Sequence, residues 1–317
     1  MSNRQTEKEY DLVVVGEINP DLVLTGDVAP AFGQVEKMVA DATLTVGSSA
    51  CIFACGAARL GLRVAFIGKV GADEFGQFMR EQLVQRGVEV GGLVVDPRIK
   101  TGLSVILSQG SDRAILTYAG TIPELRYEEI DAGILARARH LHMGSYYLLQ
   151  ALRPQVPLLF SRAREMGLTI SLDSNYDPSE RWDGVQGLLS RVDVFLPNET
   201  ELCAITGENE VSAALQKLAY RNLVVAIKLG PRGGAVWWNE RFASAPALPV
   251  QVVDTTGAGD SFDAGFLYGY LQGWELERSL ALACICGSLS TRAAGGTSAQ
   301  PTWDEAAGYL AGYKIES

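Results

Sequence analysis

The segment from Val252 to Phe266 carries residue types whose spacing could support phosphoryl transfer. An apolar run ends at Asp254, glycines follow at Gly257 and Gly259, and Asp260 then opens a stretch with apolar residues at helical spacing. The glycines let the backbone turn sharply, and the free N–H groups of a helix start attract an anion. We expect the dipole of that helix to keep the Asp260 carboxylate ionised. An anion hole beside a fixed carboxylate suits the transfer of a phosphoryl group onto a hydroxyl.

The same pattern has a purely structural interpretation, which stays open at this point. Gly-x-Gly before a helix is often only a turn, and Asp is common in the first turn of any helix. Two other phosphate-binding loops are excluded. A dinucleotide-binding fingerprint needs glycine or alanine where Phe262 stands, and the Gly-Lys-Ser/Thr of a Walker loop occurs nowhere in the sequence.

The overall composition narrows the class of protein. The 317 residues include 37 acidic and 27 basic ones, a formal net charge of −10, which argues against binding to nucleic acid or to an anionic membrane. Five cysteines, an odd number, and a polar N-terminal stretch unlike a signal peptide favour a cytoplasmic protein with free thiols.

Short apolar runs alternate with helical patterns along the chain. This alternation predicts an α/β fold in which a mostly parallel sheet is sandwiched by helices, with a body of residues 1–20, 46–92 and 121–317. Residues 21–45 and 93–120 have β-rich patterns, with a hairpin turn expected at 110–112. Helices are expected over 49–60, 75–86, 155–166, 199–206, 211–219, 260–272, 276–292 and 302–312.

Residues 254–262, followed by Ala264 and Gly265, resemble the C-terminal signature of the ribokinase-like (PfkB) carbohydrate kinases. Further segments resemble other motifs of that family, in the same order and over nearly the whole chain. They are 15–21, which holds an Asn-x-Asp sugar clamp, 58–61 with 68–76, and 196–201. The resemblance implies an ATP- and Mg²⁺-dependent kinase acting on a sugar hydroxyl, with K⁺ as a candidate activator.

The resemblance also implies how the parts are used. The two β-rich segments would form a small β-stranded lid that closes over the sugar, and the lid could join two copies into a homodimer. Asp260 would be the catalytic base, and Gly257, Ala258 and Gly259 would form the anion hole. The sugar-binding residues would be Asn19, Asp21, Gly47 and Ser48. The nucleotide-binding residues would be Asn198, Lys228, Gly230, Gly233 and Cys284.

Several of these residues have a structural interpretation beside the functional one. Asn198 and Glu201 have the spacing of a helix capping box, but Glu201 could also hold Mg²⁺ through water, and the two roles can coexist. Asp254 either helps to bind a monovalent cation or fixes the turn. Asn19 and Asp21 flank a proline after a strand, where an isolated Asn-Pro-Asp would favour a turn.

Three departures from the family pattern affect specificity and leave the phosphoryl-transfer residues intact. Ser48 replaces the second glycine of the usual pair, Ile52 stands where many relatives have a sugar-contacting asparagine, and Cys284 stands where an asparagine often contacts adenine. Lys228 likewise stands where many relatives have a small hydroxyl residue. These positions leave the sugar and the base undetermined.

Two alternatives to a sugar kinase remain within the resemblance. One is a nucleoside kinase of the same family, and the other is a non-catalytic sugar-binding or regulatory member. The intact Gly-Ala-Gly-Asp sequence that ends at Asp260 argues against the non-catalytic alternative. A nicotinamide-dependent oxidoreductase is disfavoured because the dinucleotide fingerprint is absent.

Overall fold

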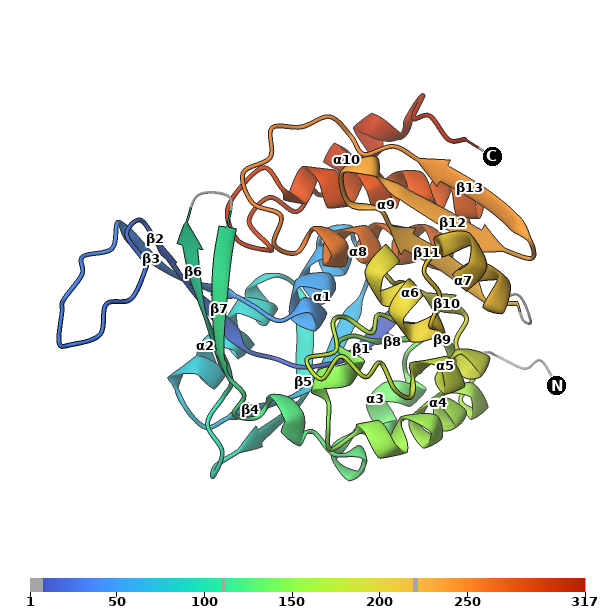
Figure 1. Ribbon diagram of the computed structural model, residues 1–317. Helices are drawn as coiled ribbons and strands as arrows, with labels where there is room; N and C mark the ends of the chain where they lie inside the picture. The colour runs from blue at the N-terminus through green and yellow to red at the C-terminus, as the bar shows by residue number, and fades with distance from the viewer. Residues whose placement is uncertain (1–7, 110–111, 219–221, 317) are drawn as a thin grey trace.

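A long central sheet forms the body of the protein (Figure 1). The computed structural model describes residues 8–109, 112–218 and 222–316. Neighbouring strands of the sheet are parallel from β11 to β5, and β12 and β13 are antiparallel at the other edge. In spatial order the nine strands are β13 (Arg241–Ala245), β12 (Gly234–Trp238), β11 (Val224–Lys228), β10 (Val194–Phe195), β9 (Thr169–Leu172), β8 (His140–Met143), β1 (Leu12–Val15), β4 (Val64–Gly71) and β5 (Val88–Asp96).

Helices cover both faces of this sheet, because its central strands are apolar on both sides. In β1 the side chains of Leu12 and Val14 belong to one core, and those of Val13 and Val15 belong to the other. The first core is closed by α1 (Ser49–Arg59), α2 (Glu74–Gln85), α8 (Ala258–Leu271), α9 (Leu276–Ser290) and α10 (Trp303–Leu310). The second core is closed by α3 (Ala132–Ala136), α4 (Val156–Glu165), α5 (Val185–Leu188), α6 (Glu199–Thr206) and α7 (Val211–Lys217).

A second sheet of four strands stands beside the body and forms the lid (Figure 1). Its order is β3 (Asp41–Val46), β2 (Pro20–Thr25), β6 (Leu103–Gln109) and β7 (Asp112–Tyr118). Asp21, Ser104 and Thr117 are in register across three of these strands, and so they share one face. The other face, here called the outer face of the lid, carries Leu22, Leu44, Val105, Leu107, Leu116 and Tyr118.

The predicted architecture is confirmed, and the boundaries differ in places. Helix 199–206 matches the expectation residue for residue, whereas the helix expected from 260 begins at Ala258. Residues 93–96 were expected in the lid, but they complete β5 and pair with β4 in the body sheet. The expected turn residues 110 and 111 and the last residue of the expected helix 211–219 lie outside the described residues. Among the described helices, none has the length and apolar character needed to cross a membrane.

Candidate active site

The polar residues singled out by the sequence meet where parallel strands end. Asn19 follows β1, Asp173 follows β9, and Lys228 is the last residue of β11. The carboxyl ends of parallel strands lie at one edge of a sheet, and this edge faces the starts of α1 and α8. These strand ends therefore bring the polar side chains together, with a cavity beside Lys228 and the start of α8.

The glycine turn leads directly into α8. Gly257 has a left-handed backbone, with φ 73°, and caps the helix. The Ala258 N–H donates to the Thr255 carbonyl at 3.2 Å, whereas the N–H groups of Gly259 and Asp260 have no acceptor among the described residues. Within the first turn of α8 the unbonded donors are those of Gly259 and Asp260, and the N–H of Gly257, just before the helix, also has no acceptor among the described residues.

The Asp260 carboxyl is buried, with 7% of the residue exposed, and it is hydrogen-bonded to Ser49 of α1. Burial raises the pKa of Asp260 well above its ordinary value, the charge of Asp173 raises it further, and Lys228 opposes the change. Burial therefore opposes the expected effect of the helix start, which favours the ionised form of this carboxyl. A raised pKa suits a group that must accept a proton near neutral pH.

Asn19 and Asp21 form the expected pair at the junction of body and lid. The Asn19 Nδ2 lies 3.5 Å from Asp21 Oδ1 and 3.4 Å from Ser104 Oγ, and both members of the pair are nearly fully buried. Burial and the nearby Glu17 raise the pKa of Asp21 to about 7. Gly47 lies against this pair, and a Cβ there would fall 2.1 Å from Asp21 Oδ1. Position 47 must therefore be glycine if the Asp21 carboxyl is to stay where it is.

Ser48 keeps the backbone of the glycine that it replaces. Its φ of 66° lies in the left-handed region, and its hydroxyl donates to the Glu17 carbonyl at 2.6 Å while accepting from the Cys51 N–H at 3.2 Å. Ile52, one turn further along α1, packs against Gly257 and Gly296 near the turn. The first departure therefore shapes the loop, and the second places an apolar side chain beside the turn.

A polar network that the sequence reasoning missed connects Glu17 to Asp260. The Asn175 amide donates to Ser145 Oγ at 3.0 Å, and Ser49 Oγ lies 3.4 Å from Asn175 Oδ1. Ser145 is in turn bonded to the buried carboxyl of Glu17. Ser145 and Asn175 both have left-handed backbones, with φ 53° and 54°. Each follows a sheet strand, so the rule that ligands bind at carboxyl ends of strands could have pointed to them.

A cavity of about 490 Å³ lies beside the glycine turn. Its walls come from the end of β11, the 230–233 turn, the 247–252 segment, the start of α8 and one face of α9. This one cavity brings together the predicted residues Lys228, Gly230, Gly233, Ala258, Gly259 and Cys284. Cys284 lines it and is 3% exposed. The volume of the cavity and its mostly apolar lining suit a small-molecule ligand of nucleotide size.

Asn198 and Glu201 form a complete capping box at the start of α6. The Glu201 N–H donates to Asn198 Oδ1 and the Asn198 N–H donates to Glu201 Oε2, both at 2.9 Å. Burial and the neighbouring Asp173 raise the pKa of Glu201 to about 7. The described residues contain no group of three or more His, Cys, Asp or Glu side chains that could hold a metal directly. The capping role is therefore present, and a metal role for Glu201 would have to act through water.

Asp254 fixes the turn. Its Oδ1 accepts from the Thr256 N–H at 2.9 Å, and its Oδ2 accepts from the Gly295 N–H at 2.9 Å. Arg113 of lid strand β7 donates to Thr256 Oγ1 at 2.6 Å and lies 3.9 Å from Asp254. Despite partial burial, these bonds and the guanidinium lower the pKa of Asp254. The lid thus reaches the loop that leads into the glycine turn.

The sequence model of the protein family described as pfkB family carbohydrate kinase matches residues 10–303. The chain belongs to this family. The predicted family, its ribokinase-like fold and the class of sugar kinase are confirmed.

Two related sequences and one solved structure agree with this assignment. An uncharacterized sugar kinase of Archaeoglobus fulgidus is 33% identical over 227 residues, which are 70% of this chain and 88% of the relative. An ATP-dependent ribose-1-phosphate kinase of Halopiger xanaduensis is 31% identical over 297 residues, 93% of this chain and 96% of the relative. The solved structure of Arabidopsis thaliana ribokinase, complexed with ribose and ATP, has a TM-score of 0.83 at 25% identity, covering 95% of this chain and 98% of that one.

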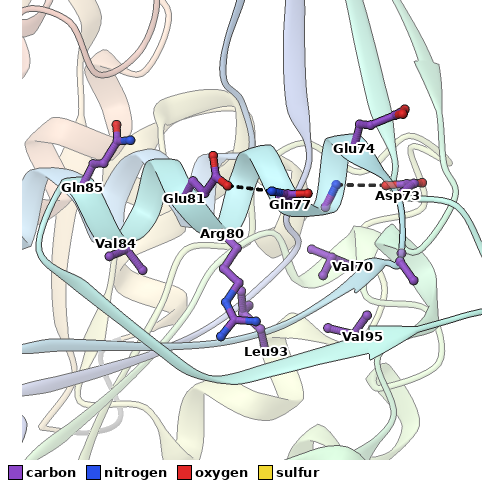
Figure 2. Close-up of a pocket in the computed structure, with 13 residues that line it drawn as sticks. Val70, Asp73, Glu74, Gln77, Arg80, Glu81, Val84, Gln85, Leu93 and Val95 are labelled. Carbon is purple, nitrogen blue, oxygen red and sulfur yellow. Dashed lines mark hydrogen bonds between the residues drawn. The ribbon is translucent and has the colours of Figure 1, made fainter.

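A larger cavity is lined by none of the residues to which the resemblance assigns a role. It has about 950 Å³ and runs between α2 and the strands β4 and β5 (Figure 2). Two of its polar side chains bond each other and a third caps a helix: Gln77 donates to Glu81 at 2.8 Å, and Asp73 accepts from the Gly76 N–H at the start of α2 at 2.9 Å. None of the predicted site residues lines it, so size alone does not identify the active site.

Proposed function

We propose that this kinase transfers the terminal phosphoryl group of ATP to a hydroxyl of a neutral sugar, with Asp260 as the base. One observation carries the proposal. The buried Asp260 carboxyl lies at the helix start that supplies two free N–H donors, next to a nucleotide-sized cavity on one side and the serine and asparagine network of the acceptor region on the other.

Each residue then has a chemical task. ATP supplies the phosphoryl group, and the N–H groups of Gly259 and Asp260 stabilise the negative charge that the group carries during transfer. The acceptor oxygen bonds to phosphorus while the bond to the leaving ADP oxygen breaks, and the acceptor proton passes to the Asp260 carboxylate. Asn19 and Asp21 hold acceptor hydroxyls, so that one of them faces Asp260.

Two ions belong to the proposal. Mg²⁺ would be held by the nucleotide phosphates and, through water, by Glu201 and Asn198, because this ion keeps most of its hydration. A monovalent cation such as K⁺ would lie near Asp254. Both oxygens of that carboxyl already accept backbone hydrogen bonds, so further oxygen ligands would have to come from the surrounding loop carbonyls.

The acceptor is proposed to be neutral, because carboxyl groups crowd its site. Asp21, Glu17 and Asp260 are all buried, and each raises the cost of bringing a second anion close. Arg113 is the lid cation that reaches this region, but it is already bonded to Thr256 and close to Asp254.

The lid is proposed to join two copies into a homodimer. Its outer face is apolar in register across the strands, and Leu44, Leu116 and Tyr118 are 37%, 61% and 55% exposed in the single chain. A contiguous exposed apolar face of this kind marks an interaction site. Sedimentation of wild type and of Leu116→Glu tests it: the dimer is expected to dissociate in the variant, and a monomeric wild type would refute it.

The proposed reaction is tested by ADP release with ATP and Mg²⁺ against a panel of neutral sugars, nucleosides, sugar acids and ribose 1-phosphate. Asp260→Asn is the control for turnover that depends on the base. We expect a neutral sugar to give the highest kcat/KM, and the Asn variant to lose that activity while still binding nucleotide. ADP release that is equal in the two proteins would contradict the assignment of the base.

A further inference from the structure

We propose that Lys228 is a further catalytic residue: its ammonium group is a fixed positive charge beneath the anion hole and donates a hydrogen bond to the phosphoryl group in transfer. The inference rests on the proposed function and assigns a task to a residue that had only been placed among the nucleotide-binding ones. The acceptor proton still goes to Asp260, and Lys228 keeps all of its own protons throughout.

The position of the Lys228 side chain carries the proposal. It leaves the end of β11 and runs below the first turn of α8, where a Cβ on Gly259 would lie 3.3 Å from its Cδ and 3.8 Å from its Nζ. Lys228, Ala258 and Gly259 line the same 490 Å³ cavity. The ammonium therefore lies at the end of the cavity where the phosphates must meet the free N–H groups of Gly259 and Asp260.

The ammonium is held in place and keeps one donor free. Its Nζ donates to Asp173 Oδ2 at 3.0 Å and to Asp263 Oδ2 at 3.1 Å, and both carboxyls are almost fully buried. An ammonium has three donors, and no third acceptor for it occurs among the described residues. A donor fixed by two buried carboxyls does not have to reorganise during the reaction, which makes its charge more effective.

The surrounding charges keep the side chain cationic. Burial alone would lower the pKa of Lys228, but the carboxyls of Asp173, Asp263 and Glu201 outweigh burial and raise it. Lys228 in turn opposes the rise in the pKa of Asp260. One cation can thus stabilise charge on the phosphoryl group and help the neighbouring base to ionise.

The competing explanation is that Lys228 only cross-links β9, β11 and α8. The chain offers a matched control, because Lys69 is a second buried lysine that bonds two carboxyls, Asp96 at 3.3 Å and Glu129 at 2.7 Å. Lys69 lines none of the cavity beside the glycine turn. Lys228→Gln and Lys69→Gln remove the same kind of buried cross-link, but only the first removes a charge from the site.

The deciding experiment measures the affinity of each folded variant for ADP and for a non-hydrolysable ATP analogue by calorimetry, together with kcat. Loss of one charge-assisted hydrogen bond is expected to weaken binding of the analogue by about 10- to 100-fold more than binding of ADP in Lys228→Gln. Its kcat is expected to fall by about 10²–10³. Lys69→Gln is expected to keep the wild-type ratio of the two affinities.

An unchanged affinity ratio and kcat in Lys228→Gln would overturn the proposal and leave Lys228 as a cross-link. If Lys228→Gln does not fold, the double variant with Asp173→Asn, which removes one charge of each sign, takes its place in the same measurement. A wild type that binds neither nucleotide would instead refute the proposed function, and this inference with it.

Discussion

Two glycines only two residues apart allow stability and catalysis to be separated. At Gly257 the backbone is left-handed, and a Cβ would lie 2.8 Å from the Gly296 backbone and from Ile52. At Gly259 the backbone is not left-handed, and the nearest atom to a Cβ is Lys228 Cδ at 3.3 Å, in a flexible side chain. Alanine at Gly257 should therefore lower the stability of the fold, whereas alanine at Gly259 should lower the rate of catalysis and leave stability nearly unchanged.

The magnitudes follow from this geometry. Gly257→Ala combines a left-handed non-glycine residue, about 1–2 kcal/mol, with overpacking against a rigid backbone, about 1–3 kcal/mol, for a total of about 2–5 kcal/mol. Gly259→Ala gains the helix preference of alanine and asks only for a small shift of Lys228, so its stability should change by no more than about 1 kcal/mol. Its kcat should nevertheless fall by at least about 10-fold, because the methyl group displaces the ammonium and narrows the approach to the free N–H groups.

Urea denaturation at equal slopes gives the stability of both variants, and steady-state kinetics on the best acceptor gives kcat. The reasoning would be refuted if Gly259→Ala lost as much stability as Gly257→Ala, or if it worked at the wild-type rate. In the first case the turn would be a structural element only, and in the second the phosphoryl group would not approach this residue.

Four further results are expected. Asp260→Asn should lower kcat by about 10²–10⁴. The folded pKa of Asp260 is raised, so the contribution of this carboxyl to stability is present at low pH and is lost as pH rises. The Asn variant should therefore resist urea better than wild type at pH 8. Asp21→Ala should raise KM and lower kcat together in the same kinetics, and an unchanged KM would remove it from the acceptor site. Glu201→Gln should raise the Mg²⁺ concentration for half-maximal rate; a lower Tm with an unchanged Mg²⁺ titration would leave only the capping role. Arg113→Ala should raise the acceptor KM and increase ATP hydrolysis without acceptor, and unchanged values for both would show that its bond to Thr256 does not close the site.

Much of the fold and the glycine turn could be predicted because the relevant interactions are local. The span of α6 follows from the capping spacing of Asn198 and Glu201, and the turn into α8 follows from the glycines before Asp260. One detail could not be predicted: the Ala258 N–H donates to the Thr255 carbonyl, whereas the N–H of Asp260 has no acceptor among the described residues. No pattern of neighbouring residues shows that bond before the backbone is known.

The other features that escaped prediction depend on distance in the sequence. Arg113 meets Thr256 across 143 residues, and the Lys228 partners Asp173 and Asp263 come from two other elements. The pKa of Asp260 also depends on burial, which a helix-start argument does not include. Residues 93–96 fell on the wrong side of the lid boundary because an alternating strand has the same pattern in either sheet.

The left-handed backbones of Ser48, Ser145 and Asn175 have a consequence for evolution and engineering. Glycine at any of them would relieve roughly 1 kcal/mol of strain, yet it would delete a hydrogen bond of the network that leads from Glu17 to Asp260. Each replacement thus exchanges backbone strain for a lost hydrogen bond of similar size, so stability should change little while the network loses a link. A library randomised at the three positions and sorted for activity should therefore return the present residues rather than glycine.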